Sequence, residues 1–210
     1  MSNVQRTIRV EALSRVEGEG GLTIRLRDGS VESVELRIYE PPRFFEAFLR
    51  GRSADEVPDI VARICGICPV AYQMSAVQAI ENARGGIITP EIRRLRQLLY
   101  CGEWIESHAL HMHLLHAPDF LNCGSGLEAA ETHGDEIRRG LRLKKYGNEL
   151  LEVLGGRAIH PINVVPGGFY RAPRRDELEP LIPHFEWGLA AAVEATRWVA
   201  SFPFPEFEQE

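Results

Sequence analysis

Apolar side chains recur every three or four positions over most of this chain, and this spacing is the strongest constraint on its fold. It predicts long helices over about 89–117, 128–154 and 176–201. The first of them opens with a threonine, a proline and an acid at 89–91, which is a typical helix start. Long helices with an apolar face bury that face against one another, so the sequence predicts a helical bundle.

The N-terminal part follows a different pattern. The segment LTIRLRDGSVESVELRIY alternates apolar and polar residues on both sides of Asp28-Gly29, which indicates a β-hairpin. After Pro41-Pro42 the spacing becomes helical, so the strands are expected to end there. The expected fold is therefore α+β, with a small N-terminal antiparallel β-sheet over 1–40 packed on a bundle of long α-helices over 41–210.

Composition and charge exclude several classes of protein. The chain of 210 residues has 24 Lys and Arg against 30 Asp and Glu, and no basic block long enough to follow a phosphate backbone. Nucleic acid is therefore not an expected partner. There is no run of about 18 apolar residues, so no membrane span is expected, and the polar first residues do not resemble a secretory signal. We expect a cytoplasmic protein whose thiols stay reduced.

Two cysteines lie close together in the segment RICGICP, residues 63–69. Pro69 suits the first turn of a helix, so Cys68 is expected to cap that helix, where the peptide dipoles stabilise a thiolate. A zinc site needs four ligands and a thioredoxin-like motif needs a βαβ framework, so both are weak interpretations. Thiols that only fill the core are another alternative. The favoured interpretation is a soft-metal site whose other thiolates come from elsewhere.

The same segment resembles a motif of a known family. Arg63-Ile64-Cys65-Gly66-Ile67-Cys68 is similar to the N-terminal cysteine motif of the large subunit of nickel-iron hydrogenases. Other segments resemble that family in the same order along the chain: Ser14-Arg15-Val16-Glu17-Gly18, Arg43-Phe44-Phe45-Glu46, Ser107-His108-Ala109-Leu110-His111 with Asp119, and His160-Pro161 with Gly167-Gly168. The resemblance covers the whole chain but only about the first half of a family member. Residues 1–210 are therefore expected to be an N-terminal part that is incomplete at the C-terminus.

The resemblance implies a set of metal ligands. In the family, nickel sits among four cysteine thiolates, two from each end of the chain. By resemblance, Cys65 is a terminal nickel ligand and Cys68 bridges nickel to an iron that carries cyanide and carbon monoxide. The remaining C-terminal half of the large subunit would supply the other pair. Glu46 would bind a hard cation, magnesium or iron, and an exposed helix acid is the alternative.

The resemblance also implies a reaction, the interconversion of H2 with protons and electrons. Dihydrogen is cleaved heterolytically while a nearby base takes the proton. Glu17 is the candidate for that base, and Arg63 of the cysteine motif is the second candidate catalytic residue. The alternatives are a strand-end carboxylate paired with Arg15 or Arg9, and a salt-bridge role for Arg63.

Two departures from the family pattern indicate a subgroup. Tyr72 and Glu19 stand where many members have histidine, and in this the chain resembles the soluble cytoplasmic enzymes that exchange electrons with NAD(P). The implied partners are flavin-containing NAD(P) diaphorase subunits together with an iron-sulfur small subunit. One alternative is a deazaflavin-linked hydrogenase. A metal-free structural relative of the quinone-reductase subunit type is another, and the cysteine pair argues against it.

Histidines are frequent in the middle of the chain. His108 and His111 are three residues apart and share a helix face, so they are expected to lie near the metal or an electron-transfer partner, or to be merely structural. His113 and His116 are expected on different faces from that pair. His160, beside Pro161, is expected to order a loop.

Overall fold

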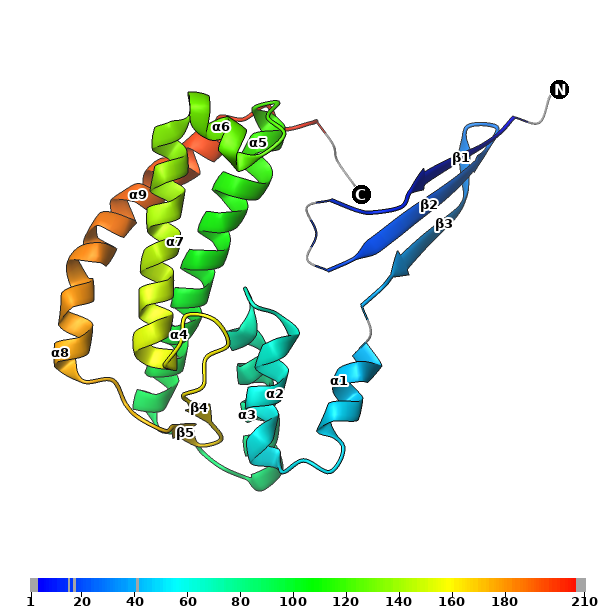
Figure 1. Cartoon of the computed structure of the whole chain (residues 1–210). Helices are drawn as coiled ribbons and strands as arrows, with labels where there is room; N and C mark the ends of the chain where they lie inside the picture. The colour runs from blue at the N-terminus through cyan, green and yellow to red at the C-terminus, as the bar shows by residue number, and fades with distance from the viewer. Residues whose placement is uncertain (1–3, 15, 17, 41, 207–210) are drawn as a thin grey trace. The chain divides into compact units, whose positions relative to one another are not determined.

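The computed structural model describes residues 4–14, 16, 18–40 and 42–206. The chain divides into two compact units, Met1–Ala47 and Phe48–Glu210. A small antiparallel sheet belongs to the first unit and long helices belong to the second (Figure 1). The expected α+β class is therefore confirmed.

The first unit contains a three-stranded antiparallel sheet in the order β1-β2-β3. Its strands are β1 (Gln5–Val10), β2 (Gly20–Arg27) and β3 (Ser30–Ile38). The hairpin predicted for β2 and β3 is confirmed: Asp28 and Gly29 have φ angles of 51° and 83°, the left-handed values that a tight two-residue hairpin turn requires. The edge strand β1 was not predicted.

One face of this sheet is apolar. The register places Ile8 opposite Ile24 and Ile24 opposite Val34, and the next row joins Val10, Leu22 and Leu36. Successive side chains along a strand point to opposite faces, so these two rows share a face. Because Val34 and Leu36 remain 60% and 58% exposed, much of this face is accessible to solvent.

The second unit is helical, and α1 (Pro42–Leu49) lies at the boundary between the units. Its helices are α2 (Val57–Val61), α3 (Pro69–Arg84), α4 (Pro90–Leu110), a π-helix (His111–His116), α5 (Ala117–Phe120), α6 (Gly126–Thr132), α7 (Gly134–Gly155), α8 (Arg175–Leu178) and α9 (Ile182–Ala200). Short 3-10 turns cover Ala54–Glu56, Ala62–Ile64 and Glu179–Leu181, and a two-stranded hairpin joins β4 (Val164–Val165) to β5 (Gly168–Phe169). Among the described residues, no helix is both long and apolar enough to cross a bilayer.

The predicted helix ends are confirmed where a cap defines them. Thr89 caps α4 by accepting a hydrogen bond from the Ile92 N–H at 3.4 Å. Gly156 follows α7 with a φ angle of 79°, a conformation that favours glycine.

All three predicted long helices depart from regular winding, and the first changes from α4 to the π-helix at His111 before α5 continues it. The helix expected over 128–154 breaks between α6 and α7 at His133. The helix expected over 176–201 is divided into α8 and α9 by the 3-10 turn, which carries Pro180, and Pro183 follows in the first turn of α9. Proline has no backbone N–H and crowds the preceding turn, so apolar spacing continues there although the α-helix does not.

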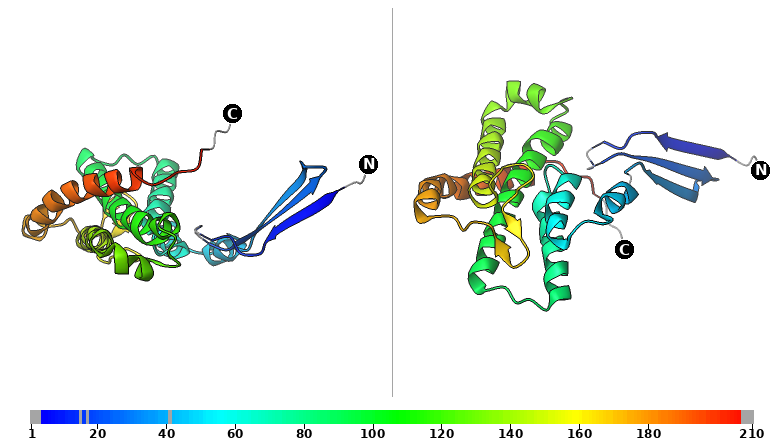
Figure 2. Two further views of the ribbon diagram at one scale, coloured as in Figure 1. Left: turned by 90° about the horizontal axis from the view of Figure 1, so that it is seen from above. Right: turned by 60° about the horizontal axis from the view of Figure 1, so that its bottom comes forward.

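The core of the second unit lies where α3, α4 and α7 pack together, and α9 covers the other side of α7 (Figures 1 and 2). The largest buried cluster combines Val70, Met74 and Val77 of α3, Leu99 of α4 and Leu150, Leu151 and Leu154 of α7. The backbones of α4 and α7 are in close contact at Gly147. A Cβ added there would lie 2.7 Å from the Gly102 carbonyl oxygen and 2.6 Å from the Glu106 nitrogen, so only glycine fits.

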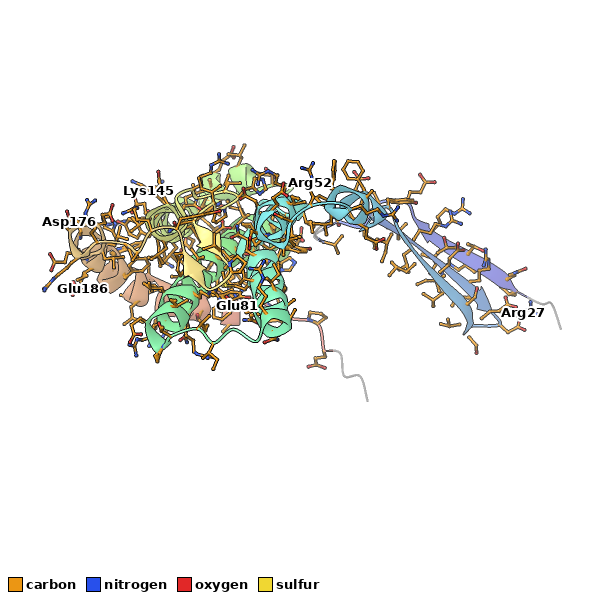
Figure 3. All side chains as sticks on the ribbon, turned by 90° about the horizontal axis from the view of Figure 1, so that it is seen from below. Arg27, Arg52, Glu81, Lys145, Asp176 and Glu186 are labelled. Carbon is orange, nitrogen blue, oxygen red and sulfur yellow. A yellow bond between two sulfur atoms is a disulfide. The ribbon has the colours of Figure 1, made fainter. Side chains whose placement is uncertain are left out.

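A buried ion pair joins three parts of this unit. Glu81 of α3 and Arg96 of α4 are 7% and 4% exposed, and two hydrogen bonds of 2.6 and 2.9 Å join their side chains. Glu81 also accepts the Gly167 N–H at 2.7 Å, so it holds the β4–β5 turn against both helices. In Figure 3 the labelled Glu81 lies among the helices, whereas Lys145 and Asp176 point outward.

Candidate functional site

The cysteine loop, defined here as residues 62–68, leads directly into α3. Cys68 is the N-cap residue of α3 and Pro69 is its first helical residue, as predicted. Cys65 ends the preceding 3-10 turn in an extended conformation, and the Cys68 N–H points at its sulfur at 3.1 Å. Both sulfurs therefore lie at the end of a helix where free N–H groups and the helix dipole favour negative charge.

The two sulfur atoms are bonded to each other, with an S–S distance of 2.01 Å and a Cα–Cα distance of 5.3 Å. This corrects the expectation of reduced thiols at Cys65 and Cys68: the two-residue gap at a helix start brings both sulfurs to one point, where they pair. Metal binding requires thiolates, so the disulfide must be reduced before a metal binds.

The donor set fits a soft metal, because two sulfurs meet at one point. Within the described part of the chain, no group of three or more His, Cys, Asp or Glu side chains could hold a metal ion. A centre with more ligands would therefore use Cys65 and Cys68 as a partial set.

A second loop lies against the cysteine loop. The Nδ1 atom of His160 lies 2.7 Å from the carbonyl oxygen of Ala62, which can only accept, so Nδ1 carries the hydrogen. The buried Gln73 of α3 donates to the Pro161 carbonyl at 2.6 Å. The expected role of His160 in ordering a loop agrees with this contact, which joins positions nearly a hundred residues apart in the sequence.

Glu103 of α4 is a residue of the site that no sequence motif indicated. It is 3% exposed, and its carboxylate accepts the Val70 N–H in the first turn of α3 at 2.6 Å. Burial raises the pKa of Glu103 to about 7, with a smaller contribution from the nearby Glu106, while the N–H groups of Val70 and Ala71 oppose the rise. The one available signal was an acid on the apolar face of a predicted helix, one turn after Leu99.

The described contacts assign no catalytic or metal-binding role to the other predicted site residues, including Arg63 of the cysteine loop. Arg63 is exposed and donates to the carbonyl oxygen of Asp59 at 2.8 Å, and no ion pair of Arg63 is found among the described residues. Glu46 is exposed on α1. Glu17 lies outside the described residues. The roles of Arg63, Glu46 and Glu17 therefore stay predictions.

The histidines are arranged by the π-helix. The Nε2 atom of His111 lies 2.6 Å from Nδ1 of His116, so the expectation that His116 faces away from His111 is wrong. A π-helix closes its turns over five residues, which brings positions five apart onto one face. His113 is buried and its pKa is lowered chiefly by desolvation, which favours the neutral ring.

His108 and His111 line an apolar groove of about 800 Å³ between α4, α7 and α9. Trp104, Tyr146 and Phe185 form part of its wall, and no residue of the cysteine loop contributes to it. The contacts of these histidines therefore give no support to a position beside the cysteine pair.

Comparison with known proteins identifies the family. Residues 43–145 match the sequence profile of the nickel-dependent hydrogenases. The alpha chain of sulfhydrogenase 2 from Pyrococcus furiosus is 42% identical over 177 residues, which cover 84% of this chain and 43% of that relative. A chain of the vhu F420-non-reducing hydrogenase from Methanocaldococcus jannaschii is 40% identical over 182 residues, covering 82% of this chain and 43% of that relative.

Solved structures give the same result. An NAD+-reducing nickel-iron hydrogenase in the H2-reduced state is similar with a TM-score of 0.81 and 34% identity, over 92% of this chain and 46% of that chain. The chain thus spans less than half the length of the relatives that it matches. It belongs to the nickel-dependent hydrogenase family and corresponds to the N-terminal part of the large subunit.

Proposed function

We propose that this chain is the N-terminal part of the catalytic subunit of a nickel-iron hydrogenase that interconverts H2 with protons and electrons. The observation that carries the proposal is the cysteine pair at the N-terminus of α3, inside the segment that matches the family. Once reduced, Cys65 and Cys68 would hold a nickel-iron centre whose iron carries cyanide and carbonyl ligands, and they would supply half of its thiolates. When bound, these metals supply the heterolytic cleavage of dihydrogen.

The residues of this chain position the ligands and handle the proton. The N-terminus of α3 stabilises the thiolates, His160 holds the backbone of the cysteine loop at Ala62, and Gln73 holds the loop of His160 at Pro161. Glu17 takes the proton that cleavage releases, and Arg63 provides positive charge beside the cysteines. Glu46 binds magnesium or iron at a separate hard-cation site.

The electrons leave through the iron-sulfur clusters of a small subunit, then through a flavin-containing diaphorase to NAD(P), in the cytoplasm. The similarity to an NAD+-reducing hydrogenase supports this acceptor. The relatives named F420-non-reducing favour it over a deazaflavin acceptor. Rates of H2-dependent reduction of NAD+, NADP+ and deazaflavin by the complete enzyme test the assignment, and a clear preference for deazaflavin would overturn it.

A nickel titration of the chain tests the ligands. With the disulfide reduced under anaerobic conditions, Ni²⁺ should produce a thiolate-to-nickel charge-transfer band, and Cys65→Ser and Cys68→Ser should each weaken it strongly. The free cysteines Cys101 and Cys123 provide matched controls, because their serine variants should bind nickel like the wild type. Wild-type binding by the Cys65→Ser/Cys68→Ser double variant would exclude the pair as ligands.

A further inference from the structure

Glu103 differs from the other buried acids of the helical unit. Glu81 is paired with Arg96, and Glu106 lies 2.7 Å from Nζ of Lys144. Glu103 is as deeply buried, yet within the described part of the chain no arginine, lysine or histidine lies at ion-pair distance from it. The partners of its carboxyl group are backbone N–H groups of the first turn of α3.

A carboxyl group in such a place favours the protonated form. Desolvation penalises the charged form of a buried acid, and two backbone hydrogen bonds compensate only in part. The first turn of α3 is also shared with Cys68, its N-cap residue. An ionised Glu103 and a thiolate would compete for the same helix N-terminus, which further favours a proton on the carboxyl group.

Glu106, the next acid on α4, forms an ion pair that extends from the buried region to the protein surface. Glu106 is three residues after Glu103 and therefore on the same face of the helix. Its partner Lys144 on α7 has a side chain that is 29% exposed, so this ion pair reaches solvent. The contact of α7 with α4 at Gly147 leaves no room for a side chain against the Glu106 backbone, so the helix carrying both acids is fixed in place.

We propose that Glu103 holds an exchangeable proton at the N-terminus of α3 and delivers it towards solvent by way of Glu106 and Lys144. In the first transfer an O–H bond of Glu103 breaks and an O–H bond forms on a carboxylate oxygen of Glu106 or on a water molecule beside it. In the second transfer the ammonium group of Lys144 releases a proton to solvent, and the O–H bond on Glu106 breaks while a new N–H bond forms on Lys144. No electron moves with the proton. The purpose of this route rests on the proposed hydrogenase function, whereas the proton site itself does not.

The test measures the titration of individual glutamates in the full chain by NMR of ¹³C-labelled carboxyl groups. We expect one buried carboxyl group to titrate near pH 7, and this titration should be lost in Glu103→Gln. Glu106→Gln should lower the pKa of Glu103, because it removes a nearby negative charge. Glu152→Gln, an exposed acid on α7, should leave the titration unchanged.

Amide exchange separates a proton-holding role from a merely structural one. Glutamine retains an oxygen that accepts the Val70 N–H, so Glu103→Gln should keep this amide protected. Glu103→Ala should increase its exchange about tenfold, which corresponds to the loss of one buried hydrogen bond.

Two results would overturn the proposal: a Glu103 that titrates in the ordinary glutamate range, or a titration near pH 7 that persists in Glu103→Gln. None of these measurements needs a bound metal or turnover. A chain that lacks the nickel site but shows the titration would refute the proposed function and leave the proton site intact, and the converse result would refute only the proton site.

Discussion

Replacing Arg96 by methionine should destabilise the helical unit by about 3–5 kcal/mol at pH 7. The substitution removes both hydrogen bonds that Arg96 donates to Glu81 and leaves the carboxylate with the Gly167 N–H. Water cannot replace the lost partner, because Glu81 is 7% exposed. The expected loss is therefore the cost of an uncompensated buried charge and not the small value of a surface pair.

The stability that the Glu81–Arg96 pair contributes depends on pH. In the wild type, Arg96 holds the pKa of Glu81 below its usual value, so the pair stabilises the fold above the unfolded pKa, and this stability is lost as the pH falls through the lowered one. Without Arg96, burial raises that pKa instead, so the penalty should shrink when the pH falls from 7 to 5.

Urea denaturation followed by circular dichroism at both pH values measures these differences. Arg94→Met is the matched control, because Arg94 lies on the same helix and pairs with Glu91 at an exposed position. Its cost should stay below about 1 kcal/mol. Equal destabilisation by Arg96→Met and Arg94→Met, or a penalty that grows towards pH 5, would refute the account of the buried pair.

Three further outcomes are expected. Gly147→Ala should lower the free energy of unfolding, measured by denaturation, by about 1–3 kcal/mol, because the added Cβ would overlap the α4 backbone. Gly188→Ala is the control: its Cβ would lie 3.8 Å from the nearest atom, so this variant should be neutral or stabilising. The difference in stability between the wild type and Glu103→Gln should change by about 3 kcal/mol between about pH 4.5 and 7, because the raised pKa of Glu103 makes the wild type lose stability as the pH rises through this range. Gly29→Ala should lower the melting temperature of the sheet, because its φ angle of 83° strains a residue with a Cβ by about 1 kcal/mol; an unchanged melting curve would contradict the turn geometry.

Local signals in the sequence predicted local structure. The Asp28-Gly29 turn, the Thr89 cap and the glycine at 156 each act within a few residues, so a sequence pattern can identify them. The cysteine pair was found for the same reason, since its spacing and its helix start are contiguous in the sequence.

The sequence patterns could not predict contacts between distant segments. Glu103 and Val70 are 33 positions apart in the sequence, and Glu81 and Arg96 are 15 apart. Each of these contacts depends on how two helices are rotated about their axes. Apolar spacing tells which face of a helix is buried but not which residue of the neighbouring helix it meets. The disulfide was missed for a chemical reason, because the expected compartment and not the geometry determined the predicted oxidation state.

The π-helix at His111–His116 makes this stretch tolerant of the loss of one residue. Its wider turn accommodates one more residue than regular winding allows. Deleting Met112 would let the helix wind without interruption, and the residues after the deletion would keep their direction relative to the residues before it, because the wider turn already absorbs the extra residue. Ala117 and Pro118 would therefore stay buried, whereas deleting a residue within the regular α4 would turn them by about 100° away from their present contacts.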